Sequence, residues 1–312
     1  MSDLTYRRKA YPELIGIIDL ISAQNPFQRK RISTFVSQQD ESYWKFGEDL
    51  IRTLNRSFLK NDQERIEAAR SYNRMCMDFL REEIRFHKTG VYLLDSSRAA
   101  QEAVYDQRSV MRYYMVGLLL SYLFWPNHYE IFRFFKDHLQ GIRVGRYLEV
   151  GIGHGLFTAE VLRRFPNIDM TVVDVSETSI EIGHEMLETF QLAASGIRFV
   201  HSDFLTVTLE PDGFDFILMG EVLEHVNDAP GFLKKAYKML RPAGQIFLTT
   251  CVNCPAPDHI YQFHTVEEIR TLIRDVGLTI VEEIILPVLP VPEDRWQEEL
   301  VTINYGAYLQ AG

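Results

Sequence analysis

A glycine-rich turn between two short apolar segments constrains this chain more than any other feature of its sequence. Residues 147–150 are apolar apart from one glutamate, which is typical of a buried parallel strand. Three glycines follow within residues 151–155, and an amphipathic helix is predicted over residues 156–165. Glycines at such a turn let a ligand approach the backbone closely, and the start of a helix offers free N–H groups.

The next apolar segment, residues 170–173, ends in Asp174, nineteen residues after Gly155. A carboxylate at this position accepts hydrogen bonds from both hydroxyls of a ribose, so the segment predicts a nucleoside-binding β-α-β unit. A dinucleotide site uses Gly-x-Gly-x-x-Gly to bind a pyrophosphate, whereas this chain has Leu156 where the last of those glycines would stand. The spacing therefore disfavours a nicotinamide-dependent reductase.

Four motifs, in this order, resemble those of the class I methyltransferases that use S-adenosylmethionine. They are Glu149-Val-Gly-Ile-Gly-His-Gly155 with the acidic Asp174, the segment His201-Ser-Asp203-Phe-Leu, and the strand-and-loop segments 214–226 and 240–250. The resemblance covers roughly residues 140–285. It implies an α/β fold with a Rossmann-like sheet of seven strands, the last of them antiparallel.

The resemblance also implies which residues hold the methyl donor. The acidic residue that ends the second strand would bind the ribose, and Asp203 would meet the adenine amino group. Glu149, buried by its position, is expected to accept hydrogen bonds from the glycine loop or to meet the amino group of the donor. The expected cofactor-binding residues are Glu149, Gly151, Gly153, Gly155, Asp174, Val175, Asp203, Phe204, Gly220 and Glu221.

Composition predicts a cytoplasmic protein with two domains. A length of 312 residues allows a helical domain over residues 1–140 and an S-adenosylmethionine-binding catalytic domain over residues 141–312. We expect no secretory leader, and the longest apolar stretch, residues 113–125, is too short to span a membrane. The three cysteines are expected to be reduced thiols. Residues 141–312 carry 12 basic and 25 acidic side chains, which argues against a nucleic-acid partner.

The first domain is expected to be all-helical, because its apolar residues recur at three- and four-residue spacing. Helices are predicted over residues 11–23, 43–59, 63–87, 99–125 and 128–139. We interpret them as a cap that closes the substrate site and excludes water, with a homodimer interface as the alternative. Aromatic residues of the fourth helix are expected to be mostly core, with some lining an aromatic or apolar substrate.

Ligands of an open α/β sheet lie beyond the carboxyl ends of its parallel strands. The loops expected at this edge are residues 151–155, 174–177, 219–227 and 251–264. The loop at residues 287–296 joins the last two predicted strands and lies at the same edge, and its three prolines make it stiff. Leu289 or Trp296 is expected to contact the substrate or the helical cap.

Methyl transfer requires an acceptor atom held in line with the sulfonium, and often deprotonated. A lone base is one means of activation, with His225, His259 and His264 as candidates. A divalent metal is the other, because Glu221, Glu224 and His225 would share one face of a helix. Such ligands suit magnesium, manganese or iron. The stretch resembles the metal-binding motif of the quinone-pathway O-methyltransferases and of the enzymes that methylate small-RNA 3′ ends, and this resemblance implies that a later histidine, here His259, completes the site. Local charge pairing is the alternative.

Cys251, Cys254, His259 and His264 form a competing pattern with the spacing of a zinc knuckle. A zinc module of this kind would indicate a nucleic-acid contact. The basic residues that a knuckle needs are missing, however, and two prolines stiffen the interval. Cysteines that close a strand are more often small core residues.

The sequence thus predicts an S-adenosylmethionine-dependent methyltransferase that acts on a small molecule of specialised metabolism, with a divalent metal as an optional second cofactor. It does not distinguish oxygen, nitrogen and carbon acceptors. The alternative is a non-catalytic S-adenosylmethionine-binding regulatory or scaffold protein, whose helices serve as a docking domain. That alternative predicts a ligand edge open to solvent.

Overall fold

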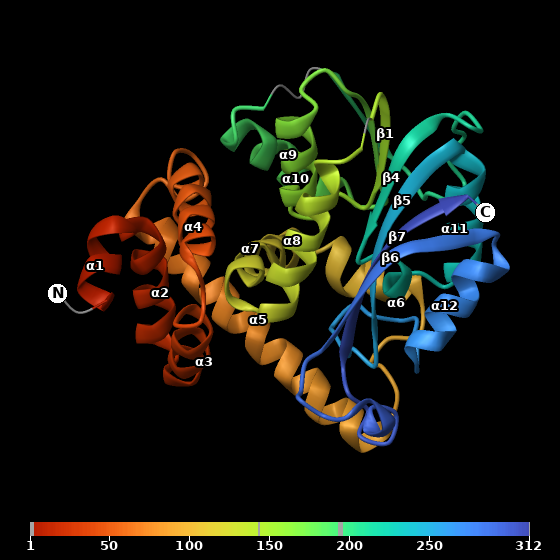
Figure 1. The fold of residues 1–312 in the computed structure, drawn as a ribbon. Coiled ribbons are helices and arrows are strands. Elements are labelled where there is room, and N and C mark those ends of the chain that lie inside the picture. The colour runs from red at the N-terminus through yellow and green to blue at the C-terminus, as the bar shows by residue number, and fades with distance from the viewer. Residues whose placement is uncertain (1–2, 143, 193–195, 312) are drawn as a thin grey trace.

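The computed structural model describes residues 3–142, 144–192 and 196–311, and a seven-stranded sheet forms its centre (Figure 1). The strands are β1 (Arg146–Val150), β2 (Asp169–Asp174), β3 (Ile197–His201), β4 (Phe214–Gly220), β5 (Leu240–Val252), β6 (Leu278–Pro287) and β7 (Ile303–Ala311). Their order is β3-β2-β1-β4-β5-β7-β6, and β7 runs antiparallel to both of its neighbours. The predicted fold class is confirmed.

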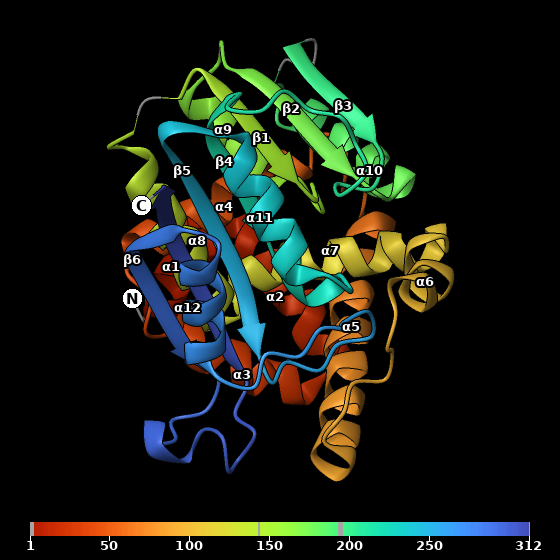
Figure 2. The same ribbon diagram turned by 90° about the vertical axis from the view of Figure 1, so that its right-hand side faces the viewer.

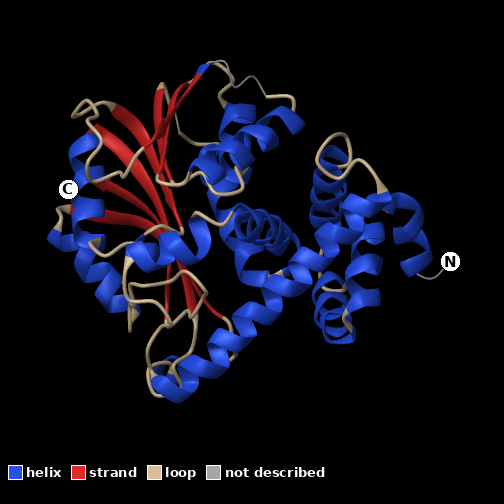
Figure 3. Ribbon diagram, turned by 180° about the vertical axis from the view of Figure 1, so that it is seen from behind, coloured by secondary structure: helices blue, strands red, loops and turns tan. Residues whose placement is uncertain are grey.

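Helices cover both faces of the sheet, as Figure 3 shows. One face packs against α11 (Ala229–Met239) and α12 (Val266–Asp275), and the other against α8 (Pro126–Leu139), α9 (Leu156–Arg164) and α10 (Glu177–Thr189). The β1 and β4 strands are apolar on both sides because both of their faces are buried. Among the described residues, no helix combines the length and the apolar composition that crossing a bilayer requires.

The N-terminal region is helical, as predicted, but two of its details differ from the prediction. Its other helices are α1 (Asp3–Ala10), α2 (Pro12–Gln24), α3 (Pro26–Val36), α4 (Glu41–Leu54), α5 (Asp62–Thr89), α6 (Ser97–Ala100) and α7 (Arg108–Phe124). The sequence analysis missed α1 and α3; Pro26 starts α3 at a position that lacks an N–H partner anyway, and Asn25 caps it. The single helix predicted over 99–125 is wrong, because a π-helical turn at Gln101–Tyr105 separates α6 from α7.

The helical region and one face of the sheet share a continuous core. Phe135 of α8 packs with its ring centroid 4.9 Å from that of Phe157 on α9 and 4.9 Å from that of Phe247 on β5. The Tyr308 hydroxyl of β7 donates to the Phe135 carbonyl at 2.8 Å. The predicted boundary between residues 140 and 141 therefore follows a helix that already belongs to the core of the sheet.

The backbones of α5 and α7 approach each other at Gly117. A Cβ atom built at Gly117 would lie 2.8 Å from the Met75 sulfur and 2.9 Å from the Met75 Cβ, closer than side-chain atoms pack. Gly16, inside α2, has only the end of the Arg65 side chain nearby, at 3.4 Å. One helical glycine is thus required by packing, whereas the other is not.

We predict that Gly117→Ala lowers the free energy of unfolding by about 1–3 kcal/mol, because the added methyl group overpacks the contact with Met75. The matched variant Gly16→Ala should raise it by about 0.5–1 kcal/mol, since alanine favours the helix. Urea denaturation followed by circular dichroism measures both. Equal effects of the two variants would show that the α5–α7 crossing does not depend on glycine.

Candidate functional site

A cavity of about 890 Å³ lies at the carboxyl edge of the parallel strands. All four loops expected at this edge contribute to its wall, through residues such as Gly151, Asp174, Glu221 and Cys254. The opposite wall comes from the helical region. The lining residues with aromatic side chains that belong to this region are Phe27, Phe79, Tyr105, Tyr114, Tyr122, Trp125 and His128.

The glycine loop adopts a backbone that other residues rarely allow. Gly151 and Gly153 have φ angles of 79° and 51°, and no atom lies closer than 3.9 Å to a Cβ built at Gly153. The Asp174 carboxylate accepts hydrogen bonds from the Ile152 N–H at 2.9 Å and from the Ser176 N–H at 2.8 Å. Burial raises the pKa of Asp174 to about 6. The acidic residue thus fixes the loop and keeps lone pairs for a ligand.

Nine of the ten expected cofactor-binding residues line the cavity. They are Glu149, Gly151, Gly153, Asp174, Val175, Asp203, Phe204, Gly220 and Glu221. Gly155 is the exception: it caps α9 with a φ of 72° and lies against Gly183 of α10, so its role is helix packing. His154 is buried in the same loop, where its Nδ1 accepts from the Leu156 N–H and its ring packs on Tyr122.

Glu149 does not accept hydrogen bonds from the glycine loop, which corrects that part of the prediction. Its Oε2 atom accepts from the Tyr147 hydroxyl at 2.9 Å and from the Thr158 hydroxyl at 2.8 Å. Burial raises the pKa of Glu149 to about 8, although both hydrogen bonds act in the opposite direction. The side chain still lines the cavity and remains available to a ligand.

The segment from Glu221 to His225 is not an α-helix, so the predicted shared helix face does not exist. A single 3₁₀ turn spans Leu223–His225, and Glu221 has a φ of 52°, a left-handed conformation that is unusual for glutamate. Its N–H is held by the Thr249 carbonyl and by the Thr249 hydroxyl at 2.9 Å. Backbone strain of this kind concentrates at functional sites.

Glu224 is fully buried, and among the described residues only one of its two carboxylate oxygens has a hydrogen-bond partner. Its Oε2 atom accepts from the Thr250 hydroxyl at 2.7 Å, but no donor among the described residues reaches Oε1. The Oε1 atom lies 3.9 Å from Nε2 of His225, and the Glu221 carboxylate is close by. Burial, and then the charge of Glu221, raise the pKa of Glu224 well above its ordinary value. A buried carboxylate beside a partly buried one needs a proton or a cation between them.

His259 completes this cluster. Its Nδ1 atom lies 2.6 Å from the Cys254 carbonyl, an acceptor, so Nδ1 carries a proton and Nε2 is the ring nitrogen left for other partners. Ligand atoms of Glu224, His225 and His259 all lie within 4.8 Å of one another. Burial alone would lower the pKa of His259, but the Cys254 thiol and the Glu224 carboxylate reverse this and raise it to about 10.

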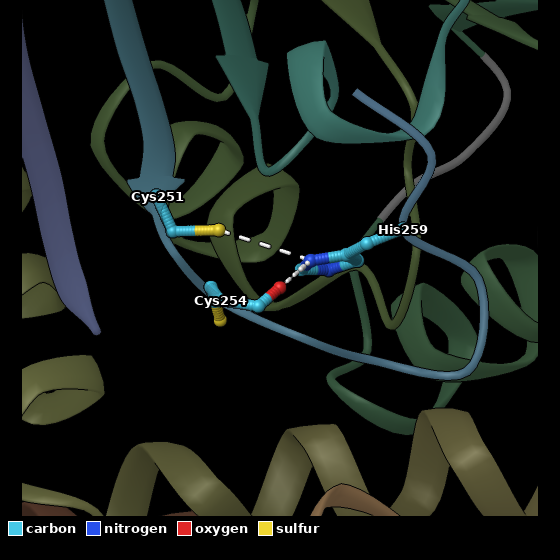
Figure 4. A group of neighbouring side chains, drawn as sticks. All are labelled: Cys251, Cys254 and His259. Carbon is cyan, nitrogen blue, oxygen red and sulfur yellow. Dashed lines mark hydrogen bonds between the residues drawn. The ribbon is translucent and has the colours of Figure 1, made fainter. Parts of the chain in front are cut away.

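The zinc-knuckle pattern does not close into a four-ligand site. Cys251, Cys254 and His259 are neighbours, as Figure 4 shows, but His264 is exposed and its backbone N–H donates to Glu268. The His259 Nδ1 atom, 3.8 Å from the Cys251 sulfur, is already bonded to a carbonyl. His264 therefore lies apart from the other histidines, and it is not positioned to act with them as a base or as a zinc ligand.

The proline-rich loop reaches the cavity through one of its two predicted residues. Leu289 lines the cavity together with Val288, whereas Trp296 donates its indole N–H to the Val291 carbonyl and packs within the loop and the adjacent core. The loop and the end of α5 project from the same end of the molecule (Figure 2). About half of the Val288 and Leu289 side chains is exposed there.

Three polar residues at the cavity were not assigned a role from the sequence. Asp258 is 2% exposed and accepts hydrogen bonds from the hydroxyls of Tyr105 and Tyr114. These tyrosines belong to the helical region, and helical periodicity indicates only that aromatic residues are core. The one local sequence signal for this group was an acidic residue, Asp258, directly before His259.

Glu149 gives a prediction for stability against pH. Its pKa is about 8 in the folded protein against 4.5 in an unfolded chain, so the folded state binds the extra proton. Its stabilising contribution is complete below pH 4.5 and is lost as the pH rises through 8. As the pH rises from 5 to 8, the free energy of unfolding of the wild-type protein should therefore fall relative to that of Glu149→Gln, by up to about 1.4 kcal/mol per pH unit. Urea denaturation between pH 5 and 8 measures this; the exposed Glu298→Gln is the control, and parallel curves would contradict the prediction.

Comparisons with known proteins agree with this geometry. Residues 148–248 match the family model described as a methyltransferase domain. A ubiquinone biosynthesis O-methyltransferase of Parvibaculum lavamentivorans is 30% identical over 188 residues, which cover 52% of this chain and 70% of the relative. Another from Idiomarina loihiensis is 30% identical over 120 residues, covering 38% and 46%. The chain spans about half the length of most of these curated relatives.

Solved structures support the same fold. A phosphoethanolamine N-methyltransferase 2 of Haemonchus contortus, in complex with S-adenosyl-L-methionine, superposes with a TM-score of 0.50 at 13% identity. The superposition covers 70% of this chain and 61% of that one. At this identity the likeness concerns the fold alone. From the family model, the Parvibaculum relative and the sheet topology together, the chain belongs to the class I S-adenosylmethionine-dependent methyltransferases.

Proposed function

We propose that this protein transfers a methyl group from S-adenosylmethionine to an oxygen atom of a small aromatic or apolar molecule. The observation that carries the proposal is the shared cavity, whose walls come from the glycine loop on one side and from helix-borne aromatic residues on the other. A cavity of about 890 Å³ is within the range of enclosed small-molecule sites. The helices would act as the cap that excludes water from the reaction.

The residues at the glycine loop fit the methyl donor. Gly153 leaves open space for close approach, and both Asp174 oxygens keep a lone pair after their backbone hydrogen bonds. Asp203, at the next strand end, lines the cavity where the adenine would lie. When bound, S-adenosylmethionine supplies the activated methyl group, and these residues orient it.

Aromatic side chains favour an acceptor with a flat or apolar body. Tyr122 and Met115 of α7, Trp125 directly after it and Phe79 of α5 line the cavity, so a buried acceptor would contact rings and a thioether. Relatives named O-methyltransferases of ubiquinone biosynthesis support an oxygen acceptor. We keep the prediction of a small-molecule substrate. A substrate from quinone metabolism fits that prediction as well as one from specialised metabolism.

A divalent metal fits the cluster of Glu224, His225 and His259. The fit rests on the unpartnered Oε1 atom of buried Glu224, which faces Nε2 of His225. The Nδ1 atom of each histidine has its own acceptor, the usual support of a metal-bound imidazole. When bound, magnesium, manganese or iron would lower the pKa of an acceptor hydroxyl. Without a metal, His225 is the residue placed to take the proton.

The second wall of the cavity, which comes from the helical region, favours an enzyme over a non-catalytic binding protein. A scaffold that only binds S-adenosylmethionine would need no acceptor pocket, and its ligand edge would be open. Here Tyr105, Tyr114 and Tyr122 cover that edge, and each of them is at least half-buried.

We predict that Asp174→Ala weakens binding of S-adenosylhomocysteine by about 1–3 kcal/mol, the cost of losing hydrogen bonds to a charged group. Isothermal titration calorimetry measures the affinity. Asp169→Ala removes an exposed carboxylate from the other end of β2 and should leave the affinity unchanged. Normal binding by a folded Asp174→Ala protein would exclude the ribose assignment.

Manganese binding tests the metal. The loss of free Mn²⁺ signal in electron paramagnetic resonance should show one bound ion per chain. Glu224→Gln should weaken it at least tenfold, the lower bound of the loss even for outer-sphere partners. Cys251→Ser should leave it unchanged, because that thiol does not belong to the Glu224–His225–His259 group. If the wild-type protein did not bind manganese, the deprotonation of the acceptor would instead be assigned to His225 acting as a base.

A further inference from the structure

The helical region provides two hydroxyl groups that hold one buried carboxylate of the site. The Tyr114 hydroxyl donates to Asp258 Oδ1 at 2.9 Å, and the Tyr105 hydroxyl donates to Oδ2 at 3.2 Å. Nδ1 of His225 lies 3.4 Å from the same Oδ2 atom. Asp258 is 2% exposed, so its charge is balanced by these neighbours rather than by water.

Counting donors and acceptors fixes the tautomer of His225. Its Nδ1 atom faces the Asp258 carbonyl oxygen at 3.2 Å and the Tyr105 hydroxyl at 3.0 Å. A tyrosine hydroxyl has one proton, and that of Tyr105 goes to the Asp258 carboxylate, so the hydroxyl accepts from the ring. Every partner of Nδ1 is then an acceptor. The proton therefore belongs on Nδ1, and the lone pair of Nε2 faces the cavity and Glu224.

A break in helical geometry places Tyr105 at this point. Gln101–Tyr105 is a π-helical turn, a form that is rare and is found mostly at functional sites. The preceding α6 is tied to the loop after His225, because the Ser97 N–H and hydroxyl both donate to the Asn227 side chain. Residues 97–105, which we name the α6 arm, thus contact the β4 loop at two separate points.

We propose that Tyr105 and Tyr114 are positioning residues for His225. The Tyr105 hydroxyl accepts from Nδ1, and both hydroxyls hold Asp258 beside the ring, so that His225 keeps the tautomer that presents Nε2 to the cavity. The α6 arm is then a part of the site and not only its cover. The same tautomer serves His225 as a base or as a metal ligand. The proposal rests on the proposed function only in treating the cavity as the methyl-transfer site.

The tautomer is directly measurable in the full-length, ligand-free protein. Long-range ¹H–¹⁵N correlation spectra of ¹⁵N-histidine-labelled protein distinguish protonated from unprotonated ring nitrogens, and His225→Gln identifies the His225 signals among the nine histidines. We expect the wild-type protein to show His225 with Nδ1 protonated. Tyr105→Phe should shift both nitrogen signals toward the mean of the two tautomers, and Tyr114→Phe should shift them in the same direction by less.

Tyr113→Phe is the matched control, because this neighbour on α7 donates to Asp78 and is absent from the cavity wall. It should leave the His225 signals unchanged. A wild-type His225 protonated on Nε2 overturns the proposal without any variant, and so does an unshifted His225 in folded Tyr105→Phe. Calorimetry with S-adenosylhomocysteine on the wild-type protein tests the methyltransferase function separately, so the failure of one is not mistaken for the failure of the other.

Discussion

The packing of α8 against the sheet determines where α7 lies relative to the glycine loop. Phe135 fills the space between Phe157 and Phe247, and burying an aromatic side chain of this size stabilises the fold by about 1.5–3 kcal/mol. Once α8 is fixed, Pro126 turns the chain directly into α7. The Tyr122 ring then lies 5.0 Å from the His154 ring of the glycine loop. The roof of the cavity is therefore set by the core and not by a flexible attachment.

Much of the fold could be predicted because its signals are local. Short apolar segments ending in glycine or aspartate identified β1 and β2, and the resemblance of four ordered motifs to the class I methyltransferases implied the topology of the sheet. The interruption between α6 and α7 left only a weak signal, because the break in apolar spacing is confined to residues 106–109 and the spacing resumes at Val110. Its cause is tertiary, since the π-helical turn places Tyr105 against His225 and Asp258.

The candidate site likewise has parts that could be predicted from the sequence and parts that could not. The loops that hold Asp174 and Glu221 could be predicted because the carboxyl ends of parallel strands meet at one edge. Sequence spacing suggested a helix face for Glu221, Glu224 and His225, whereas a left-handed residue and a 3₁₀ turn place the Glu224 carboxylate near both Glu221 and His225. The pairing of Asp258 with Tyr114 joins residues 144 positions apart, which no local pattern reports.

The close crossing of α5 and α7 at Gly117 has a consequence for how a molecule enters the cavity. The Met75 side chain of α5 packs directly on the Gly117 backbone of α7, so the two helices slide or separate only by breaking that contact. A molecule that enters or leaves the cavity must then pass segments of its wall that no such contact holds. The exposed Val288 and Leu289 belong to one of these, and Phe27 of α3 to another. Entry and product release would thus be controlled by the rim of the cavity, while the wall behind it stays still.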